Sequence, residues 1–456
     1  MDLVIESSVQ KVHQMNSVPQ HLFKTFAAVI CLHSSAHCTE AFAPSTEPHE
    51  LTSYTVQPGD TLASLIGDLQ LPEDSAQALH QLKTINPSHS ITALRPGHAL
   101  KVPQSWLRQD SSPLRVSQMT CTGTLLPELS DGRVLAPDQW LAEGSTIKVP
   151  IGCKVGLLLQ DGSRLYLPSG AVVRLDVLRQ QVLHKAPLVQ IRLLQGRLGL
   201  DIYKQRPARS RIEVQTPKAT TGVRGTQFRV GLSPQQQDTL IEVLEGKVQA
   251  HGNSDQQATT IDKLEGLVIS AEGQSHEPEK LLPAPQLSHN SQTQGWVFLP
   301  VTHASAYAIE KLANANTSVE ETPHITPSPY VLPPVNPTSA AELYRAASIT
   351  PSGLKGPSAT YAMCGQPACN IPFDLSEAQG HIKRFELKHI QGQTSQTMLS
   401  TQISGTMASM IAAGLKPGHY QWSIEYNSSS SSAQPSQAIR TQGDFILSSP
   451  RTVASQ

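Results

Sequence analysis

The chain has 456 residues with a formal net charge of −1, and only 16% of them are charged and 5% aromatic. This charge balance excludes the bulk basicity that holds nucleic acid. The length favours three or four domains. The 34 prolines and 29 glycines favour turn-rich β modules over one large helical enzyme.

The first 43 residues are predicted to be a signal peptide (1–43). Lys24 precedes a short apolar run at residues 26–32, and Ala41-Phe42-Ala43 has the small-x-small pattern that signal peptidases cut. Because the segment before Lys24 is long for a signal, the true start could be Met15; a buried amphipathic segment is the alternative. No other stretch approaches the ~20 apolar residues that cross a bilayer, so we expect a soluble mature protein.

Residues 53–103 are predicted to form a small α+β module that begins with a strand. Tyr54 to Gln57 have the character of a short strand, and Pro58-Gly59 predicts a turn because glycine takes positive φ freely. Asp60 is expected to cap the following helix, since its carboxylate accepts backbone N–H bonds and suits the positive helix end. Apolar residues at helical spacing then extend to Leu69.

A second helix and a closing strand complete this module. Apolar residues from Ala76 to Ile85 recur at helical spacing and stop before Asn86-Pro87. Pro96-Gly97 predicts another turn, and Leu100 and Val102 alternate as in a strand. This βααβ order with two Pro-Gly turns resembles the lysin motif (LysM), a module that binds chitin- or peptidoglycan-type glycans; generic hairpin turns are the alternative.

The resemblance implies a glycan site between the first turn and the segment after the second helix. Backbone amides and small polar groups there would bond the N-acetyl groups of the sugar, and Leu62 and Ile91 would pack on its apolar face. The implied partner is peptidoglycan or a related N-acetylated glycan. The residues assigned to this site are Gly59, Asp60, Thr61, Leu62, Asn86, Pro87 and Ile91.

The middle of the chain is predicted to be an all-β domain of sandwich or barrel type. Apolar and polar residues alternate with period two, and turns such as Asp161-Gly162-Ser163 separate the alternating runs about every eight to twelve residues. The expected strands cover residues 155–160, 164–167, 171–175, 189–194, 212–215, 239–244 and 247–250.

Residues 216–230 contain the most specific motif, a Thr-Pro pair followed by Val-Arg-Gly-Thr-x-Phe at the start of a strand. This pattern resembles the signature of the FecR-type domain. Residues 140–147, 161–163 and 244–248 match further landmarks of that domain, so the resemblance covers residues 114–272. The signature residues are Thr216, Pro217, Val223, Arg224, Gly225, Thr226 and Phe228.

The best-known FecR proteins are membrane-anchored regulators that relay an envelope signal to a sigma factor, and they carry a transmembrane helix before the periplasmic domain. Here a segment that resembles the lysin motif stands in that place. The resemblance therefore implies a β fold and a periplasmic or secreted location in a Gram-negative envelope more than it implies anti-sigma activity. Arg224 could bind a carboxylate or phosphate, but we favour a role in tying its loop to backbone carbonyls.

The last third of the chain is predicted to contain a linker and two β-sandwiches. Residues 273–294 are rich in Pro, Ser and His, which is typical of a linker. Residues 295–365 and 366–449 each contain strand and turn patterns that resemble a fibronectin type III-like sandwich. Such sandwiches act as spacers or binding platforms, so the fold alone does not fix the function.

The cysteine pattern fits an exported protein. Cys31 and Cys38 would leave with the signal, and an even number then remains: Cys121, Cys153, Cys364 and Cys369. Cys364 and Cys369 could close a small disulfide loop, whereas a pairing of the other two rests on parity alone. A zinc half-site at Cys364-x4-Cys369 is the alternative, but no second Cys pair or His cluster completes it.

The sequence contains no His-Glu-x-x-His, P-loop or Gly-x-Ser-x-Gly motif. Residues 151–154 and His251-Gly252 resemble the Cys and His-Gly loops of L,D-transpeptidases, but they come in the reverse order. We predict no enzymatic activity, no metal and no cofactor.

Together these patterns predict a mainly β, multidomain envelope protein. It would comprise a βααβ LysM module, an all-β FecR-type domain and two immunoglobulin- or fibronectin III-like sandwiches. The LysM module would bind peptidoglycan, and the β domains would present surface to other envelope components. A soluble co-regulator in FecR-like trans-envelope signalling is the alternative, and a cell-wall enzyme of unrecognised type is a third possibility.

Overall fold

The computed structural model is mainly β and multidomain, as the sequence predicts, with two α-helices in the part of the chain that it describes. Neither helix is long and apolar enough to span a membrane. The predicted signal peptide lies outside the described residues. The structure describes residues 50–448 except 88–90, 92, 122, 205–206, 208, 224, 235–236, 291–294, 313–314, 316–323, 327–329, 333–340, 365–368, 376–381, 402–408 and 428–437.

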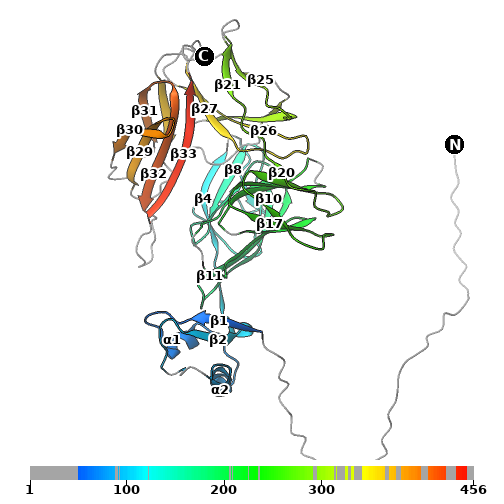
Figure 1. The fold of residues 1–456 in the computed structure, drawn as a ribbon, viewed down its shortest axis with the longest axis vertical. Helices are drawn as coiled ribbons and strands as arrows, with labels where there is room; N and C mark the ends of the chain where they lie inside the picture. Colours follow the sequence, from blue (N-terminus) through cyan, green and yellow to red (C-terminus); the bar gives the residue numbers. More distant parts are fainter. Residues whose placement is uncertain are drawn as a thin grey trace, which may run out of the picture. The chain divides into compact units, whose positions relative to one another are not determined.

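The N-terminal module has the expected order β-α-α-β (Figure 1). Its strands pair antiparallel, with Leu51 opposite Pro103 and Thr55 opposite Ala99. The elements are β1 (Leu51–Thr55), α1 (Leu62–Gly67), α2 (Ser75–Ile85) and β2 (Ala99–Pro103).

The first helix begins one residue later than the sequence predicts. Its N-cap is Thr61, whose Oγ1 accepts a hydrogen bond from the Ser64 amide, and the Ser64 hydroxyl accepts one in return from the Thr61 amide. This reciprocal capping box satisfies two amides that a helix N-terminus leaves open. Asp60 is not the cap, because its carboxylate accepts hydrogen bonds from Tyr54 and Gln57 instead.

The core of the module extends beyond its predicted end at residue 103. A 3₁₀ helix, Gln104–Trp106, follows β2, and Trp106 and Leu107 are buried in one cluster with Leu65 and Leu82. Leu183, from the next domain, joins the same cluster. Residues 104–107 therefore belong structurally to the module and are not a linker after it.

Two nine-stranded sheets form the next domain. The first sheet contains β3 (Gln109–Ser111), β5 (Glu128–Leu129), β7 (Thr146–Lys148), β10 (Val172–Gln181), β11 (Ala186–Gln195), β13 (Arg211–Gln215), β14 (Ala219–Val223), β17 (Val248–Gly252) and β18 (Thr259–Ile261). The second contains β4 (Leu114–Cys121), β6 (Trp140–Leu141), β8 (Cys153–Leu158), β9 (Arg164–Leu167), β12 (Arg197–Asp201), β15 (Gln227–Leu232), β16 (Thr239–Glu245), β19 (Glu265–Ile269) and β20 (Glu279–Lys280).

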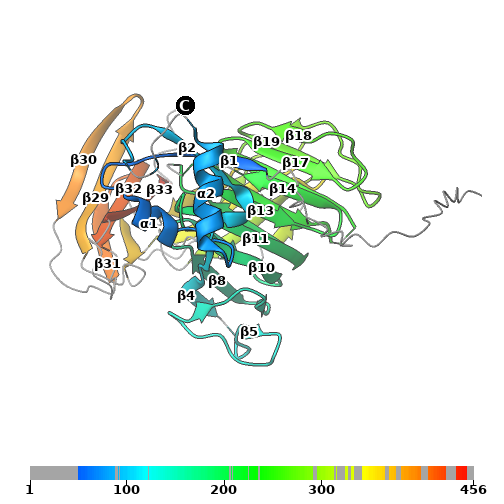
Figure 2. The same cartoon turned by 90° about the horizontal axis from the view of Figure 1, so that it is seen from below.

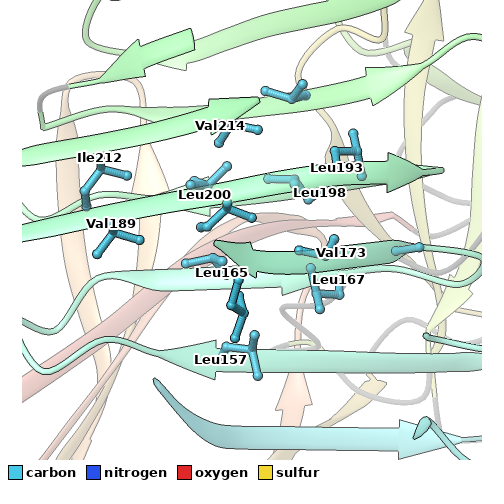
Figure 3. Packing of buried hydrophobic residues seen from close by; sticks show 14 of the residues in the cluster. Leu157, Leu165, Leu167, Val173, Val189, Leu193, Leu198, Leu200, Ile212 and Val214 are labelled. Atoms are coloured by element: carbon cyan, nitrogen blue, oxygen red, sulfur yellow. The ribbon is translucent and has the colours of Figure 1, made fainter. Parts of the chain in front are cut away.

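One hydrophobic core joins these two sheets. It is built from the inward-facing residues of alternating strands, as the period-two pattern requires. Figure 3 shows the packing of side chains from both sheets, among them Leu157 and Leu165 of the second sheet and Val189 and Ile212 of the first. All four are buried, with exposed fractions of 5% or less. The domain is therefore a β-sandwich.

Glycines let the chain cross between the two sheets. The chain leaves the first sheet after Val223 and returns to it at Val248, and these two crossings lie side by side. Gly225 and Gly246 have φ of +62° and +85°, a region that residues with a Cβ avoid. A Cβ on Gly246 would also lie 2.6 Å from Cγ2 of Thr226, on the other crossing.

The described residues of the C-terminal part form three more sheets. An eight-stranded sheet has the order β24 (His324–Thr326), β23 (Ala306–Leu312), β26 (Glu342–Ile349), β27 (Ala359–Met363), β33 (Ala438–Ser448), β32 (Gly418–Asn427), β29 (Ile382–Gln391) and β30 (Thr394–Thr401). A three-stranded sheet contains β21 (Leu287–Asn290), β22 (Gly295–Phe298) and β25 (Tyr330–Val331), and a two-stranded sheet contains β28 (Cys369–Asp374) and β31 (Ser409–Leu415).

The two predicted C-terminal sandwiches share a sheet, so the expected boundary at residues 365 and 366 does not separate them. Parallel pairing of β27 with β33 places Tyr361 opposite Ile446 and makes the eight-stranded sheet continuous. Alternate residues of β26 and β27 then serve two different cores. Tyr344 and Tyr361 join the core around Trp296, whereas Leu343 and Ala362 join the core around Phe373.

Residues 273–294, predicted as a linker, are largely built into the fold. β20 pairs with β19, and β21 pairs with β22. Between these strands, the carbonyls of Pro283 and Pro285 accept hydrogen bonds from Ser348 and Tyr361. A Pro-rich segment has few amides to offer a sheet, but its carbonyls remain good acceptors, and composition alone does not reveal this.

Replacement of Gly246 by Ala should destabilise the sandwich, because the backbone conformation alone costs about 1–3 kcal/mol for a residue with a Cβ. The added methyl would also collide with Thr226. Gly222→Ala is the matched control, since a Cβ there meets no atom within 4 Å. Urea unfolding of both variants is the measurement, and equal midpoints would contradict this account of the crossings.

Candidate functional site

The turn between β1 and α1 contains four residues of the predicted glycan site, of which Gly59 and Thr61 are exposed. Gly59 has φ of +94°, and Thr61 is exposed while Leu62 is half-buried. Asp60 Oδ2 accepts hydrogen bonds from Tyr54 Oη and from the Gln57 amide, each at 2.7 Å. Burial and the bond to Asp60 raise the pKa of Tyr54, so Tyr54 remains a donor. Asp60 therefore holds the shape of the turn.

Two of the predicted glycan-binding residues lie inside the module. Asn86 is only 4% exposed; its Nδ2 donates to the carbonyls of Leu82 and Lys101, and its Oδ1 accepts from the Lys101 amide at 2.7 Å. Ile91 is 2% exposed and packs in the core. Asn86 thus joins the end of α2 to β2, and neither side chain offers surface to a sugar. Pro87 is exposed.

The turn between β10 and β11 supports the module beside this site. Leu183 enters the module core, and the His184 ring stacks on Tyr54 with 5.8 Å between ring centroids. The amide of Val182 donates to the carbonyl of Arg108. Burial, and then the charge of Arg209, lower the pKa of His184, so its ring is neutral near pH 7. Tyr54 therefore contacts the β10–β11 turn through its ring and orders the turn of the predicted glycan site through its hydrogen bond to Asp60.

The described residues of the Thr-Pro…Val-Arg-Gly-Thr-x-Phe signature have structural roles. Thr216 Oγ1 accepts from the Ala219 amide at 3.0 Å and lies 2.7 Å from the Thr239 hydroxyl. Pro217 is exposed next to this turn. Val223 and Phe228 are buried in the core shared by the two sheets, one on each side of the crossing.

The crossing itself is formed by a Gly-Thr pair. Gly225 approaches Lys204 closely, since a Cβ on it would lie 3.2 Å from the Lys204 Cα. Thr226 is 1% exposed. Arg224 lies outside the described residues, so both hypotheses about its side chain stay predictions. The signature is explained by the path of the chain between the sheets.

A cluster that we call the clamp lies on the outer face of the second sheet. It consists of Arg197 on β12, Arg229 on β15 and Glu242 on β16. Arg229 Nε lies 2.7 Å from Glu242 Oε2, and Arg197 lies 2.8 Å from Oε1 of the same carboxylate. Glu242 is fully buried, so these two guanidinium groups supply the charge that its carboxylate needs.

The clamp binds the backbone of residues 353–356, which connect β26 to β27. Glu242 accepts a hydrogen bond from the Lys355 amide at 2.7 Å, and Arg197 donates to the Gly353 carbonyl at 3.3 Å. Arg229 donates to the carbonyls of Lys355 and Gly356. Because these hydrogen bonds are made to main-chain atoms, they fix the backbone path of the segment largely independently of its side chains.

One side chain of that segment fills an apolar hollow beside the clamp. Leu354 is fully buried and packs with Leu240 and Leu281. A Cβ on Gly266 would lie 2.8 Å from Leu354 Cδ1, so the glycine leaves room for the leucine. Full burial of a leucine is worth about 1.5–3 kcal/mol. The clamp and this hollow together hold the C-terminal part against the sandwich.

A second buried ion pair joins the same two parts of the chain. Lys154 Nζ on β8 lies 2.9 Å from Glu310 Oε1 on β23, and both side chains are at most 5% exposed. Arg345 lies 3.6 Å from the other oxygen of Glu310. Buried pairs specify geometry more reliably than they add stability, and this one specifies which face of β23 meets the sandwich.

The four cysteines in the described part of the chain form two disulfides, Cys121–Cys153 and Cys364–Cys369. Cys153 is fully buried in the sandwich core, where it is bonded to Cys121. A nucleophilic cysteine must carry a free thiolate, and Cys153 has none here. Among the described residues, no three His, Cys, Asp or Glu side chains are grouped as metal ligands.

A comparison with protein families identifies the sandwich. Residues 145–249 match the family described as FecR protein. The chain contains a FecR domain. The matched range includes the clamp and the whole signature, and it is shorter than the range 114–272 that the sequence resemblance covers. A comparison with curated proteins finds no match.

Solved structures show only a distant likeness to the chain. Two crystal structures of a candidate anti-sigma factor from Parabacteroides distasonis ATCC 8503 are 18% and 17% identical to it, each with a TM-score of 0.24. The alignments cover 30% and 33% of this chain and 59% and 70% of those chains. The chain thus spans 59% of the length of the first of them. The assignment of the FecR domain rests on the family match.

The clamp was not anticipated from the sequence, although β16 carries a signal for it. Leu240, Glu242 and Leu244 alternate with core residues, so the strand is apolar on both faces apart from one carboxylate. A strand of that kind is covered on both sides. A buried carboxylate requires a cationic partner, and Arg229 is its cross-strand neighbour. The segment that covers Glu242, residues 353–356, lies more than a hundred residues away in the chain, and no local sequence pattern indicates this contact.

Glu242→Gln should lower the urea midpoint of unfolding at neutral pH, because removing one partner of a buried pair costs about 3–5 kcal/mol. Burial raises the pKa of Glu242, but Arg229, Arg197 and Lys355 outweigh it and hold the pKa below the ordinary value. The wild-type contribution is therefore complete above the unfolded pKa of about 4.3 and is lost as the pH falls through the lower folded value.

The variant should accordingly lose less stability than the wild type when the pH is lowered from neutral to about 3. Glu128→Gln is the matched control, because Glu128 and Lys148 are both more than 40% exposed. A surface pair of that kind contributes less than about 1 kcal/mol. Parallel pH profiles for wild type and Glu242→Gln would contradict the role assigned to the clamp.

Proposed function

We propose that this chain is a non-catalytic cell-envelope protein that binds an N-acetylated glycan of the peptidoglycan type through its N-terminal module. The observation that carries the proposal is the βααβ order of the module, with a turn before α1 in which Gly59 and Thr61 are exposed. Glycan modules of the lysin-motif type have this order, and the FecR domain that follows belongs to a family associated with the envelope.

The proposed glycan surface is narrower than the sequence alone indicates. Gly59, Thr61 and Pro87 are exposed and Leu62 is half-buried, whereas Asn86 and Ile91 are internal. The amides of Gln57, Asp60 and Thr61 bond within the turn, and the Thr61 hydroxyl caps α1. Sugar binding would therefore use the backbone of Gly59 and the apolar edge of Leu62, beside Thr61. A single small surface of this kind implies modest affinity, which additional copies would raise by avidity.

The FecR domain and the sheets that follow it would serve as a platform for envelope partners. The clamp and the Lys154–Glu310 pair fix β23 and the connection between β26 and β27 to the sandwich by buried charges. A platform with fixed geometry presents its surfaces in one arrangement, which lowers the entropic cost of binding a partner.

A second candidate function is a co-regulator in FecR-like trans-envelope signalling. The family match at residues 145–249 favours it. In that case the glycan-binding module would localise the regulator at the cell wall, and the FecR domain would contact a membrane partner. The two functions differ in whether loss of glycan binding also removes a transcriptional response.

Thr61→Asp should abolish co-sedimentation of the full chain with purified peptidoglycan sacculi. Aspartate is as good an N-cap as threonine, so α1 should keep its start, while the new charge lies in the proposed site and repels the carboxylates of the wall peptides. Gln77→Glu adds the same charge to the exposed first turn of α2 and should pellet like the wild type.

Two outcomes would contradict the proposal in different ways. If the wild type does not pellet with sacculi, the glycan-binding function is wrong. If the wild type and Thr61→Asp pellet equally, the chain binds wall through another surface and the site is wrong. Thermal unfolding of each variant provides the folding control.

A further inference from the structure

The eight-stranded sheet ends in a long strand with a free edge. β30 is the last strand in the sheet order, and within the described residues it pairs only with β29. Figure 2 shows the β29–β30 hairpin at the outer margin of this sheet. One side of β30 therefore has a row of backbone N–H and C=O groups that bond to no strand among these residues.

The other large sheets are ended differently. The strands at the ends of the two nine-stranded sheets have only two or three residues each: β5, β6, β18 and β20. The opposite end of the eight-stranded sheet is also a short strand, β24, with three residues. Very short edge strands are one of the means by which proteins prevent unwanted strand pairing. β30 has eight residues, Thr394–Thr401, which is long enough to accept a complete partner strand.

The side chains of β30 offer none of the usual protection either. Residues 391–415 contain no Asp, Glu, Lys, Arg or His and no Pro. Natural edges are commonly blocked by an inward-pointing charge, by Lys or by Pro. Residues 394–400 are all exposed, including Met398 at 49% and Leu399 at 36%. Neither face of the strand is covered by the rest of the chain among these residues.

We propose that β30 pairs antiparallel with β30 of a second copy of this chain, which joins two eight-stranded sheets across a two-fold axis. With a two-fold axis through the middle of the strand pair, the first half of one β30 lies opposite the second half of the other β30. Like charges that face each other across a strand pair are destabilising. The uncharged Thr, Ser, Gln, Met and Leu residues of β30 create no such repulsion in any register, and opposed Thr and Ser side chains can hydrogen-bond.

A second copy fits this edge better than a charged partner does. Recognition of a basic or acidic segment would need complementary charge on β30, and the strand has none. On the neighbouring strand β29, Arg384 and Lys388 both form ion pairs with Glu386, and Arg384 also donates hydrogen bonds to the Ser400 hydroxyl of β30. Pairing through main-chain atoms with a partner of equal length requires only that the partner have an unblocked edge.

The pairing has one consequence that rests on the proposed function. Two joined copies have two glycan-binding modules, so the dimer would bind sacculi with higher avidity than the monomer. The pairing itself is independent of glycan binding, and the experiment below uses no glycan.

Sedimentation equilibrium of the full chain over a range of micromolar concentrations tests the dimer. The wild type should sediment as a monomer–dimer equilibrium, and Gln396→Lys should shift it towards monomer by about tenfold or more in the dissociation constant, since a lysine at the centre of an edge strand blocks pairing. Gln442→Lys, the same change at an exposed position of β33 beside Ser423, should leave the equilibrium unchanged.

Hydrogen exchange of the wild type gives a test that needs no variant. Amides of residues 394–401 should become more protected as the dimer forms, because the outward-facing N–H groups of β30 then have acceptors. A wild type that stays monomeric throughout would overturn the proposal. A dimer in which β30 gains no protection, or which Gln396→Lys leaves intact, would overturn it as well.

Discussion

The attachment of the connection between β26 and β27 to the FecR sandwich depends on one buried carboxylate. Glu242 lies on the outer face of the FecR sandwich, where two arginines neutralise it and the Lys355 amide donates to it. A fully buried carboxylate without these partners would cost several kcal/mol. Residues 353–356, which cover the carboxylate, must therefore take the same position in every folded molecule. In that position Leu354 packs into the neighbouring apolar hollow.

The FecR signature also contributes to this attachment, although its buried residues lie on the opposite face of the second sheet. Its Gly-Thr pair turns the chain from one sheet to the other, and Phe228 then enters the core while Arg229, the next residue, points outward to the clamp. Strand geometry makes this alternation unavoidable. One short motif thus fixes both the crossing inside the sandwich and the attachment of the sheets outside it.

Sequence patterns predicted the local elements well and the long-range contacts poorly. The βααβ module, the short strands of the sandwich and the mainly β fold follow from turn residues and period-two alternation, which are local. Asn86 is assigned to the glycan site because the resemblance to the lysin motif implies a site after the second helix. Its burial and its hydrogen bond to Lys101 depend on a strand fifteen residues later. The sheet shared by residues 359–363 and 438–448 has no local signal at all.

Glycan binding by the N-terminal module is tested most directly by hydrogen exchange of the full chain with and without soluble peptidoglycan fragments. New protection is expected at residues 57–64, in the turn and the start of α1, with no change in the sandwich signature at residues 216–230. Protection confined to the sandwich, or no protection anywhere, would show that the N-terminal module is not the glycan-binding part of this protein.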